Sequence, residues 1–173
     1  MKVTYYVAAS LDGFIAKADG DVSWLDQLGI SMDESGYEEF YATVDGLIMG
    51  RKTYEMIVSF GEWPYGEKPV WVCSSTPQSP MSGCNLQPET DPQTVCDSAR
   101  QMGIEHLWCV GGGGLAAALL QADCLTNVSV SLMPLLLGEG IPLFAELSAD
   151  HRLTLVNHRL HGSGMVQLEY RLS

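Results

Sequence analysis

The sequence is short of basic residues. Nine lysines and arginines stand against 21 aspartates and glutamates, so the 173-residue chain carries a formal net charge of −12 at pH 7. Proteins that bind DNA or RNA use Lys and Arg to displace counterions from the phosphates. The shortage of basic residues therefore argues against a nucleic-acid partner.

Long apolar runs are also missing. No segment approaches the roughly 20 consecutive apolar residues that a membrane-spanning helix needs. The N-terminal segment MKVTYYVAAS enters a strand pattern at once, without the apolar core and cleavage site of a signal peptide. We therefore expect a cytoplasmic protein with no membrane partner.

The sequence lacks the patterns of common metal and hydrolase sites. Its five cysteines are odd in number and never form a CxxC pair, which argues against a disulfide framework and a zinc site. His158 and His161 lie close together in the sequence, but no third ligand accompanies them. GxSxG, Walker A and HExxH motifs are absent as well. We expect no bound metal.

Strand-like and helical segments alternate along the chain. The apolar content of 46% and the charged content of 17% are typical of a globular protein, and the length suits one domain over residues 1–173. The residue patterns predict strands at 3–10, 46–50, 68–75, 105–111 and 127–134, helices at 35–44, 52–60, 91–103 and 114–122, and a closing hairpin from 151–160 and 164–173.

The central strands are continuous apolar runs. Such runs, separated by helices, favour an α/β fold with a mostly parallel sheet covered on both faces. The segment NVSVSLMP alternates apolar and polar residues instead, which predicts a strand with one solvent-facing side. Asp91 and Pro92 are typical of a helix start, and Gly103 is typical of a helix end.

Three polar or glycine-rich features lie at or just past the ends of predicted strands. They are Gly50, Arg51, Lys52 and Thr53 at the end of the second strand, Ser74, Ser75 and Thr76 at the end of the third, and Gly111, Gly112, Gly113 and Gly114 at the end of the fourth. A helix start offers free backbone N–H groups and a positive dipole end to anions, and glycines allow close backbone approach. Ligands of such sheets bind beyond the carboxyl ends of the strands, so this arrangement predicts a dinucleotide site.

Each feature also has a purely structural interpretation. The Gly50 turn suits an ordinary helix start, and the serines suit a loop. Four consecutive glycines are harder to explain in that way, because each costs conformational entropy. The segment GGGGLA also fits the GxGxxA fingerprint, but no acidic residue follows about 20 positions later, so we do not expect a Rossmann domain.

Five segments together carry a family resemblance. VAASLDGFIA, DGLIMGRKTYE, PVWVCSSTP, LWCVGGGGLAAALLQAD and MPLLLGEGIPLF, in this order, resemble the dihydrofolate reductase superfamily, and specifically the branch shared with the reductase domain of bacterial riboflavin biosynthesis. The resemblance implies a three-layer α/β fold whose central, mostly parallel sheet ends in an antiparallel hairpin. It also implies a homodimer that uses NADPH to reduce a small heterocyclic, pterin-like or pyrimidine-like substrate.

The resemblance implies roles for particular residues. Gly50, Arg51, Lys52 and Thr53 would hold the pyrophosphate and adenosine side of NADPH, Ser74 and Ser75 the 2′-phosphate, Gly111, Gly112, Gly113, Gly114 and Leu115 the pyrophosphate and nicotinamide ribose, and Ala9 the carboxamide. The loop between residues 10 and 24 resembles the mobile loop that closes over cofactor and substrate in this family.

Two acids are candidates for binding or protonating the substrate. Asp12 matches the substrate-side aspartate of the riboflavin branch, and Glu34 has the position of the pterin-binding acid of folate reductases. A partly buried carboxyl at either position would have a raised pKa. Alternatively, Asp12 belongs to a turn beside Gly13, and Glu34 complements a helix dipole.

Some positions depart from the family. Lys68 replaces the arginine that binds the glutamate tail of folates, and Thr126 and Asn127 replace an Asp-Glu pair of the riboflavin branch. These departures argue against both a folate and a pyrimidine ribityl phosphate as the substrate. The alternative function is a nucleotide-binding module that keeps the cofactor cleft without catalytic turnover. NVSVSLMP and the final hairpin predict dimerisation through an exposed sheet edge.

Overall fold

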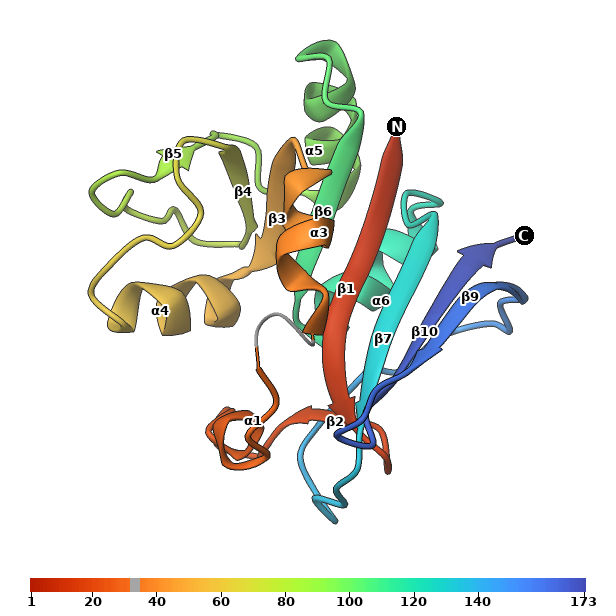
Figure 1. The fold of residues 1–173 in the computed structure, drawn as a ribbon. Helices are drawn as coiled ribbons and strands as arrows, with labels where there is room; N and C mark the ends of the chain where they lie inside the picture. Colours follow the sequence, from red (N-terminus) through yellow and green to blue (C-terminus); the bar gives the residue numbers. More distant parts are fainter. Residues whose placement is uncertain (32–34) are drawn as a thin grey trace.

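One large sheet contains strands from both ends of the chain. The computed structural model describes residues 1–31 and 35–173 (Figure 1). Its strands are β1 (Lys2–Ser10), β2 (Phe14–Ala16), β3 (Gly46–Gly50), β4 (Pro69–Cys73), β5 (Asn85–Leu86), β6 (His106–Gly111), β7 (Asn127–Met133), β8 (Ile141–Pro142), β9 (Leu153–Leu160) and β10 (Val166–Leu172). Its helices are α1 (Trp24–Gln27), α3 (Tyr37–Ala42), α4 (Arg51–Ser59), α5 (Pro92–Gln101) and α6 (Gly113–Gln121).

The strand order confirms the predicted α/β architecture. The eight-stranded sheet runs β5-β4-β3-β6-β1-β7-β10-β9. All neighbours from β5 to β7 are parallel, whereas β10 is antiparallel to β7 and to β9. None of the helices in the described parts of the chain has the length and apolarity required to cross a membrane.

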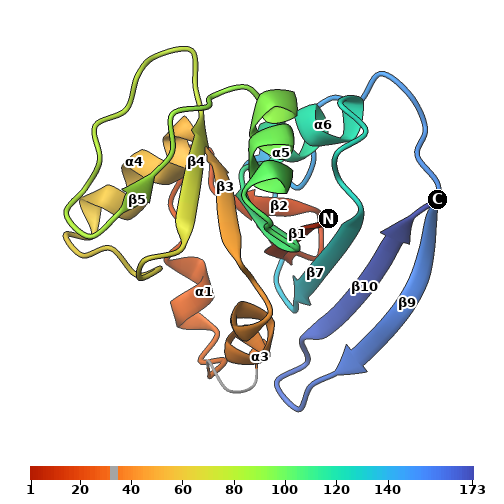
Figure 2. The ribbon, with the colours of Figure 1, turned by 90° about the horizontal axis from the view of Figure 1, so that it is seen from above.

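Alternate residues of the central strands build two separate cores. Ile48 packs on the face covered by α5 and α6, while Leu47 and Met49 pack on the opposite face with Tyr54 and Ile57 of α4. Figure 2 shows α5 and α6 on one side of the sheet and α3 on the other. The continuous apolar runs thus arise because both faces of these strands are covered.

The predicted start of α5 is confirmed, whereas the predicted end of the strand at 68–75 is wrong. The Asp91 side chain caps α5 by accepting hydrogen bonds from the backbone N–H groups of Gln93 (3.0 Å) and Thr94 (3.2 Å). Strand β4 ends at Cys73, before the predicted end at residue 75. The Ser74 hydroxyl accepts a hydrogen bond from the Thr76 N–H (3.0 Å), and this local turn diverts the backbone from the sheet.

The prediction that one side of β7 faces solvent is wrong. Ser129 and Ser131 are only 7% and 6% exposed. β7 lies between β1 and β10 rather than at an edge, and the Gln167 amide of β10 lies against the Ser129 hydroxyl at 3.5 Å. The alternation of apolar and polar residues in β7 therefore reflects one apolar and one polar side of the strand, and both sides are shielded from water.

His106 is buried between the start of β6 and α3. Its Nε2 lies 2.8 Å from the Thr4 hydroxyl, and its Nδ1 lies 3.0 Å from the Thr43 hydroxyl. Burial, followed by the positive charge of Lys2, lowers the pKa of His106 below its ordinary value. The folded protein therefore favours the neutral form of His106.

This environment predicts a stability that falls in mild acid. Below about pH 6.5 the unfolded chain binds a proton at position 106 more readily than the folded protein does, so the stabilisation is complete above that pH and is lost as the pH falls. The slope from this one group reaches at most about 1.4 kcal/mol per pH unit. In chemical denaturation between pH 8 and pH 5, the free energy of unfolding should fall less steeply for His106→Gln than for the unmodified protein. Equal slopes would contradict the assignment.

Candidate functional site

Two helix starts meet at the carboxyl edge of the sheet. The parallel neighbours β3 and β6 end at Gly50 and Gly111, and each leads almost at once into a helix, α4 or α6. A Cβ atom built on Gly50 would lie 3.7 Å from the Gly111 carbonyl oxygen and 3.8 Å from the Gly112 nitrogen. The first turns of the two helices therefore begin side by side.

Both helices begin at a glycine without a capping side chain. Gly50 (φ −77°, ψ 158°) and Gly112 (φ −89°, ψ −165°) are the N-cap residues, and no side chain of the described residues caps either helix. By contrast, α5 has the Asp91 carboxylate in this position. Free N–H groups and two positive dipole ends are thus concentrated at one place, an arrangement that favours a bound anion.

The serines after β4 lie at the same edge. Cys73 pairs with Gly50 in the parallel ladder, so Ser74 follows directly beside the start of α4. The Ser74 hydroxyl donates to the Thr76 carbonyl oxygen (2.7 Å), and Ser75 is exposed. Two of the predicted features and the row of hydroxyls therefore converge on one edge of the sheet.

Two of the four predicted glycines have a structural reason of their own. Gly113 has no room for a side chain, because a Cβ atom would approach the backbone oxygens of Pro142 and Leu143 closely. Gly111 has a φ of +133°, which side chains rarely tolerate. Gly112 and Gly114 have room for a Cβ atom. Leu115 is buried in the core with Ala116.

The cations of α4 are less concentrated than the sequence indicates. The Arg51 guanidinium pairs with Glu55 at 2.8 Å on the exposed side of the helix. Lys52 is exposed, and Thr53 is half-buried. Backbone N–H groups, rather than paired side chains, therefore dominate the positive potential at this helix start.

The expectation of a raised pKa at Asp12 is wrong. Its carboxylate accepts hydrogen bonds from the Ser10 hydroxyl (2.6 Å) and from the backbone N–H groups of Leu137 (3.1 Å) and Gly138 (2.7 Å). The Ser10 bond first, and the two N–H groups after it, lower the pKa of the exposed Asp12. The ionised Asp12 side chain therefore stabilises the loop at 137–138 by accepting its backbone N–H groups. Glu34, the other candidate, lies outside the described residues.

The loop that follows β1 is attached to a strand that the sequence did not predict. β2 pairs with β8 in a separate two-stranded sheet, with Phe14 opposite Pro142 and Ala16 opposite Ile141. Gly140 comes so close to the Ala16 backbone that a side chain there would collide with it. The two glycines of GEGIP are the sequence signal for this pairing, because Gly140 has no room for a side chain.

The residues that depart from the family lie away from the helix starts. Lys68 donates a hydrogen bond to the Val44 carbonyl oxygen, and its Nζ lies 4.7 Å from the centre of the Tyr41 ring. The Thr126 hydroxyl donates to the Val3 carbonyl oxygen (3.0 Å). Lys68 and Thr126 therefore have structural contacts, and Asn127 begins β7 at its amino end. His158 lies in β9, and His161 directly follows the end of β9 on the opposite side of the hairpin.

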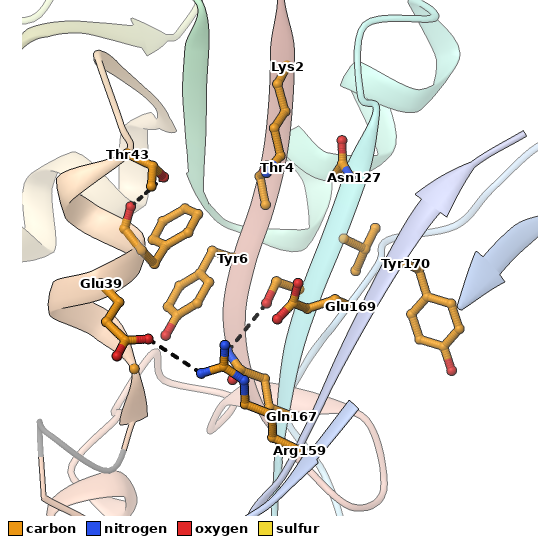
Figure 3. A pocket seen from close by; sticks show the side chains of 14 residues that line it. Lys2, Thr4, Tyr6, Glu39, Thr43, Asn127, Arg159, Gln167, Glu169 and Tyr170 are labelled. Atoms are coloured by element: carbon orange, nitrogen blue, oxygen red, sulfur yellow. Dashed lines mark hydrogen bonds and ion pairs between the residues drawn. The ribbon is translucent and has the colours of Figure 1, made fainter. Parts of the chain in front are cut away.

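A polar cavity of about 240 Å³ lies beside α3, near the amino ends of β1 and β7 (Figure 3). Arg159 reaches across it toward Glu39 at 3.4 Å, while Lys2, Gln167 and Glu169 line other parts of it. No sequence pattern indicated this cavity, because its lining comes from segments at both ends of the chain. It is separate from the carboxyl edge with the two helix starts.

Comparisons with known proteins agree with this architecture. The family model described as "RibD C-terminal domain" matches residues 1–167. The uncharacterized protein YwjB of Bacillus subtilis (strain 168) is 35% identical over 170 residues, which cover 98% of this chain and 97% of YwjB. The uncharacterized protein YyaP of the same organism is 27% identical over 176 residues, covering 95% and 91%.

Solved structures share the fold. A protein of Shewanella sp. PV-4, provisionally assigned to riboflavin biosynthesis, superposes with a TM-score of 0.86 at 28% identity, covering 100% of this chain and 99% of that one. The deaminase/5-amino-6-(5-phosphoribosylamino)uracil reductase of Thermotoga maritima gives a TM-score of 0.73 at 15% identity, covering 99% and 56%. The chain belongs to the RibD C-terminal domain family.

Proposed function

We propose that the protein is an NADPH-dependent reductase that delivers hydride to a small, flat heterocycle of the pyrimidine or pterin class. The observation that carries this proposal is the pair of glycine-started helices α4 and α6, whose first turns begin side by side without capping side chains. A dinucleotide has two adjacent phosphates that suit two adjacent helix starts. The reductase activity of the Thermotoga maritima relative supports the reaction type.

The residues present fit such a cofactor. The N–H groups of the first turns after Gly50 and Gly112 would hold the pyrophosphate, and Ser74 and Ser75 would hold the 2′-phosphate of the adenosine ribose. Ala9, buried near the carboxyl end of β1, would offer backbone groups to the carboxamide. When bound, NADPH supplies the hydride, while the protein orients the ring and excludes water.

A nucleotide-binding module without turnover is the second candidate. One specific observation favours it: the Asp12 carboxylate is held by three hydrogen bonds and has a lowered pKa, so it is a poor proton donor near neutral pH. A reductase of this family that protonates its substrate would then need another group for that step.

An assay of NADPH oxidation separates these functions. The absorbance of the reduced nicotinamide is followed with 5-amino-6-(5-phosphoribosylamino)uracil, dihydrofolate and 7,8-dihydropterin as hydride acceptors. Oxidation that depends on one of these heterocycles is the expected result. Binding of NADPH without oxidation by any of them would support the module, and absence of NADPH binding would reject both functions.

We further propose a homodimer formed through the β9–β10 hairpin. Leu153, Leu155 and Leu160 of the edge strand β9 are 43%, 49% and 78% exposed, and they belong to the side of the sheet that carries Leu168 and Leu172. A hollow of about 630 Å³ adjoins Leu153 on this side, lined by apolar residues together with Ser148, Asp150 and His151. An edge strand with such an apolar surface promotes association.

The dimer proposal predicts the effect of charged substitutions. Leu155→Lys combined with Leu160→Lys should convert a dimer into a monomer in analytical ultracentrifugation, because two desolvated charges would oppose the interface. Thr154→Lys, on the opposite side of the same strand, is the matched control and should remain dimeric. A monomeric unmodified protein would reject the proposal.

A further inference from the structure

The polar cavity beside α3 has groups of opposite charge at its two ends. Lys2 lies at the start of β1, and Figure 3 shows its side chain extended along the strand toward Thr4. Glu169 of β10 pairs with Ser129 of β7, which in turn pairs with Tyr6 of β1. Glu169 therefore lies four residues, or about 13 Å, farther along the strand direction than Lys2.

The charges at each end of the cavity are unbalanced. Lys2 forms no ion pair with any other residue in the ranges 1–31 and 35–173 that the structure describes. At the other end, Arg159 is the single cation among the described lining residues, beside the two carboxylates of Glu39 and Glu169. One end of the cavity is thus positive, and the other end is negative.

The charged groups at the negative end are loosely held. Arg159 Nη1 lies 3.4 Å from Glu39 Oε2, and the Asn157 amide donates to Glu169 Oε1 at 3.3 Å. The other ion pairs among the described residues all measure 2.8 Å, within the range of about 2.7 to 2.9 Å for strong charge-assisted bonds. A ligand can therefore contact both carboxylates without breaking a strong interaction of the folded protein.

Neutral side chains line the space between the two ends. Thr4, Ser129 and Gln167 are buried, and the Gln167 amide lies 3.5 Å from the Ser129 hydroxyl, at the limit of a hydrogen bond. The rings of Tyr6 and Phe40, whose centres are 4.0 Å apart, stack on each other and add an apolar wall. The lining accordingly suits a short apolar chain with a charged group at each end.

The size of the cavity limits its ligand. The volume of about 240 Å³ is below the roughly 300 to 1,000 Å³ of pockets for drug-sized molecules, so neither a dinucleotide nor a folate suits it. We propose that the cavity binds a small ω-amino acid, whose carboxylate lies at Lys2 and whose ammonium group lies at Glu39 and Glu169. The bound ligand joins β1, α3 and β10. The site does not depend on the proposed reductase function, because it is separate from the helix starts of α4 and α6.

Calorimetric titration with 6-aminohexanoate, hexanoate and hexylamine tests the requirement for both charges. The three probes have chains of equal carbon number and differ in their charged ends. 6-Aminohexanoate should bind at least about tenfold more tightly than either singly charged probe, because each of its ends meets a group of opposite charge. No binding of 6-aminohexanoate, or an affinity no greater than that of hexanoate or hexylamine, would overturn the proposal.

Two variants test the assigned ends of the cavity. Lys2→Met and Glu169→Gln each remove one charge and nearly keep the length of the side chain, and each should weaken 6-aminohexanoate binding by about tenfold or more. Lys17→Met and Glu62→Gln make the same changes at exposed positions outside the cavity and should bind the probe like the unmodified protein. Equal affinity in all four variants would show that the probe binds elsewhere.

Two controls separate this site from the fold and from the cofactor site. The melting temperatures of ligand-free Lys2→Met and Glu169→Gln should stay close to that of the unmodified protein, because neither residue forms an ion pair with a described residue. Saturating NADPH should leave the affinity for 6-aminohexanoate unchanged. Displacement of the probe by NADPH would place it at the carboxyl edge of the sheet and contradict the assignment.

Discussion

Replacing Gly113 by alanine is expected to lower the free energy of unfolding by about 2 to 3 kcal/mol, the upper part of the range for overpacking. The added Cβ atom would approach the Leu143 carbonyl oxygen at 2.9 Å and the Pro142 carbonyl oxygen more closely still. Both are backbone atoms, which cannot rotate away as a flexible side chain would. The start of α6 or the segment that follows β8 must therefore shift.

Gly114→Ala is the matched control for this prediction. No described heavy atom lies within 4 Å of a Cβ atom at Gly114, and the residue is helical. Alanine there should raise the stability by up to about 1 kcal/mol, because glycine is the poorer helix former. Denaturant unfolding of the two variants measures the difference. Similar stabilities would show that the glycine run is not held by the backbone at Pro142 and Leu143.

Gly50→Asp is expected to raise the stability of the protein slightly and to lower its affinity for NADPH strongly. Gly50 has an extended conformation that any residue adopts, and a Cβ atom there would make only ordinary contacts. An aspartate would cap α4 and raise its stability by a few tenths of a kcal/mol. The same carboxylate would occupy the N–H groups that the pyrophosphate needs and would repel it. We expect NADPH affinity to fall by about 100-fold or more, which corresponds to about 2.7 kcal/mol.

Gly50→Asn distinguishes charge from capping. Asparagine has nearly the same shape and also caps a helix, but it carries no charge. It should weaken NADPH binding much less than aspartate, and the gap between the two should narrow at high salt. Calorimetric titration of both variants supplies the comparison. If Asp and Asn bind NADPH as tightly as glycine does, the phosphates do not lie at the start of α4.

Much of the fold was predictable because local and tertiary requirements coincide. The apolar run at 46–50 is buried on both faces, and Asp91 and Pro92 start α5 as their chemistry requires. The burial of Ser129 and Ser131 was not predictable, because it depends on Gln167, a residue of the distant strand β10. The pairing of β2 with β8 likewise joins short segments that lack any strand periodicity.

The site shows the same division. The features after β3, β4 and β6 were found from the sequence because parallel strands place their carboxyl ends at one edge. The glycine run was assigned entirely to a ligand, whereas Gly113 and Gly111 have packing and conformational reasons. Asp12 was a candidate acid because it matches the substrate-side aspartate of the riboflavin branch. Its hydrogen bonds to Leu137 and Gly138 could not be inferred, because these residues are far away in the sequence. Sequence patterns thus indicate where the helix starts and their free N–H groups lie, but they do not show which side chains already form hydrogen bonds within the protein.

Calorimetric titration of the unmodified protein with NADPH and with NADH tests the central claim most directly. Two adjacent, uncapped helix starts and the hydroxyls after β4 predict that NADPH binds, and that it binds at least about tenfold more tightly than NADH because of the 2′-phosphate. If neither NADPH nor NADH produces binding heat, and neither displaces the other, the claim that α4 and α6 form a phosphate site is contradicted.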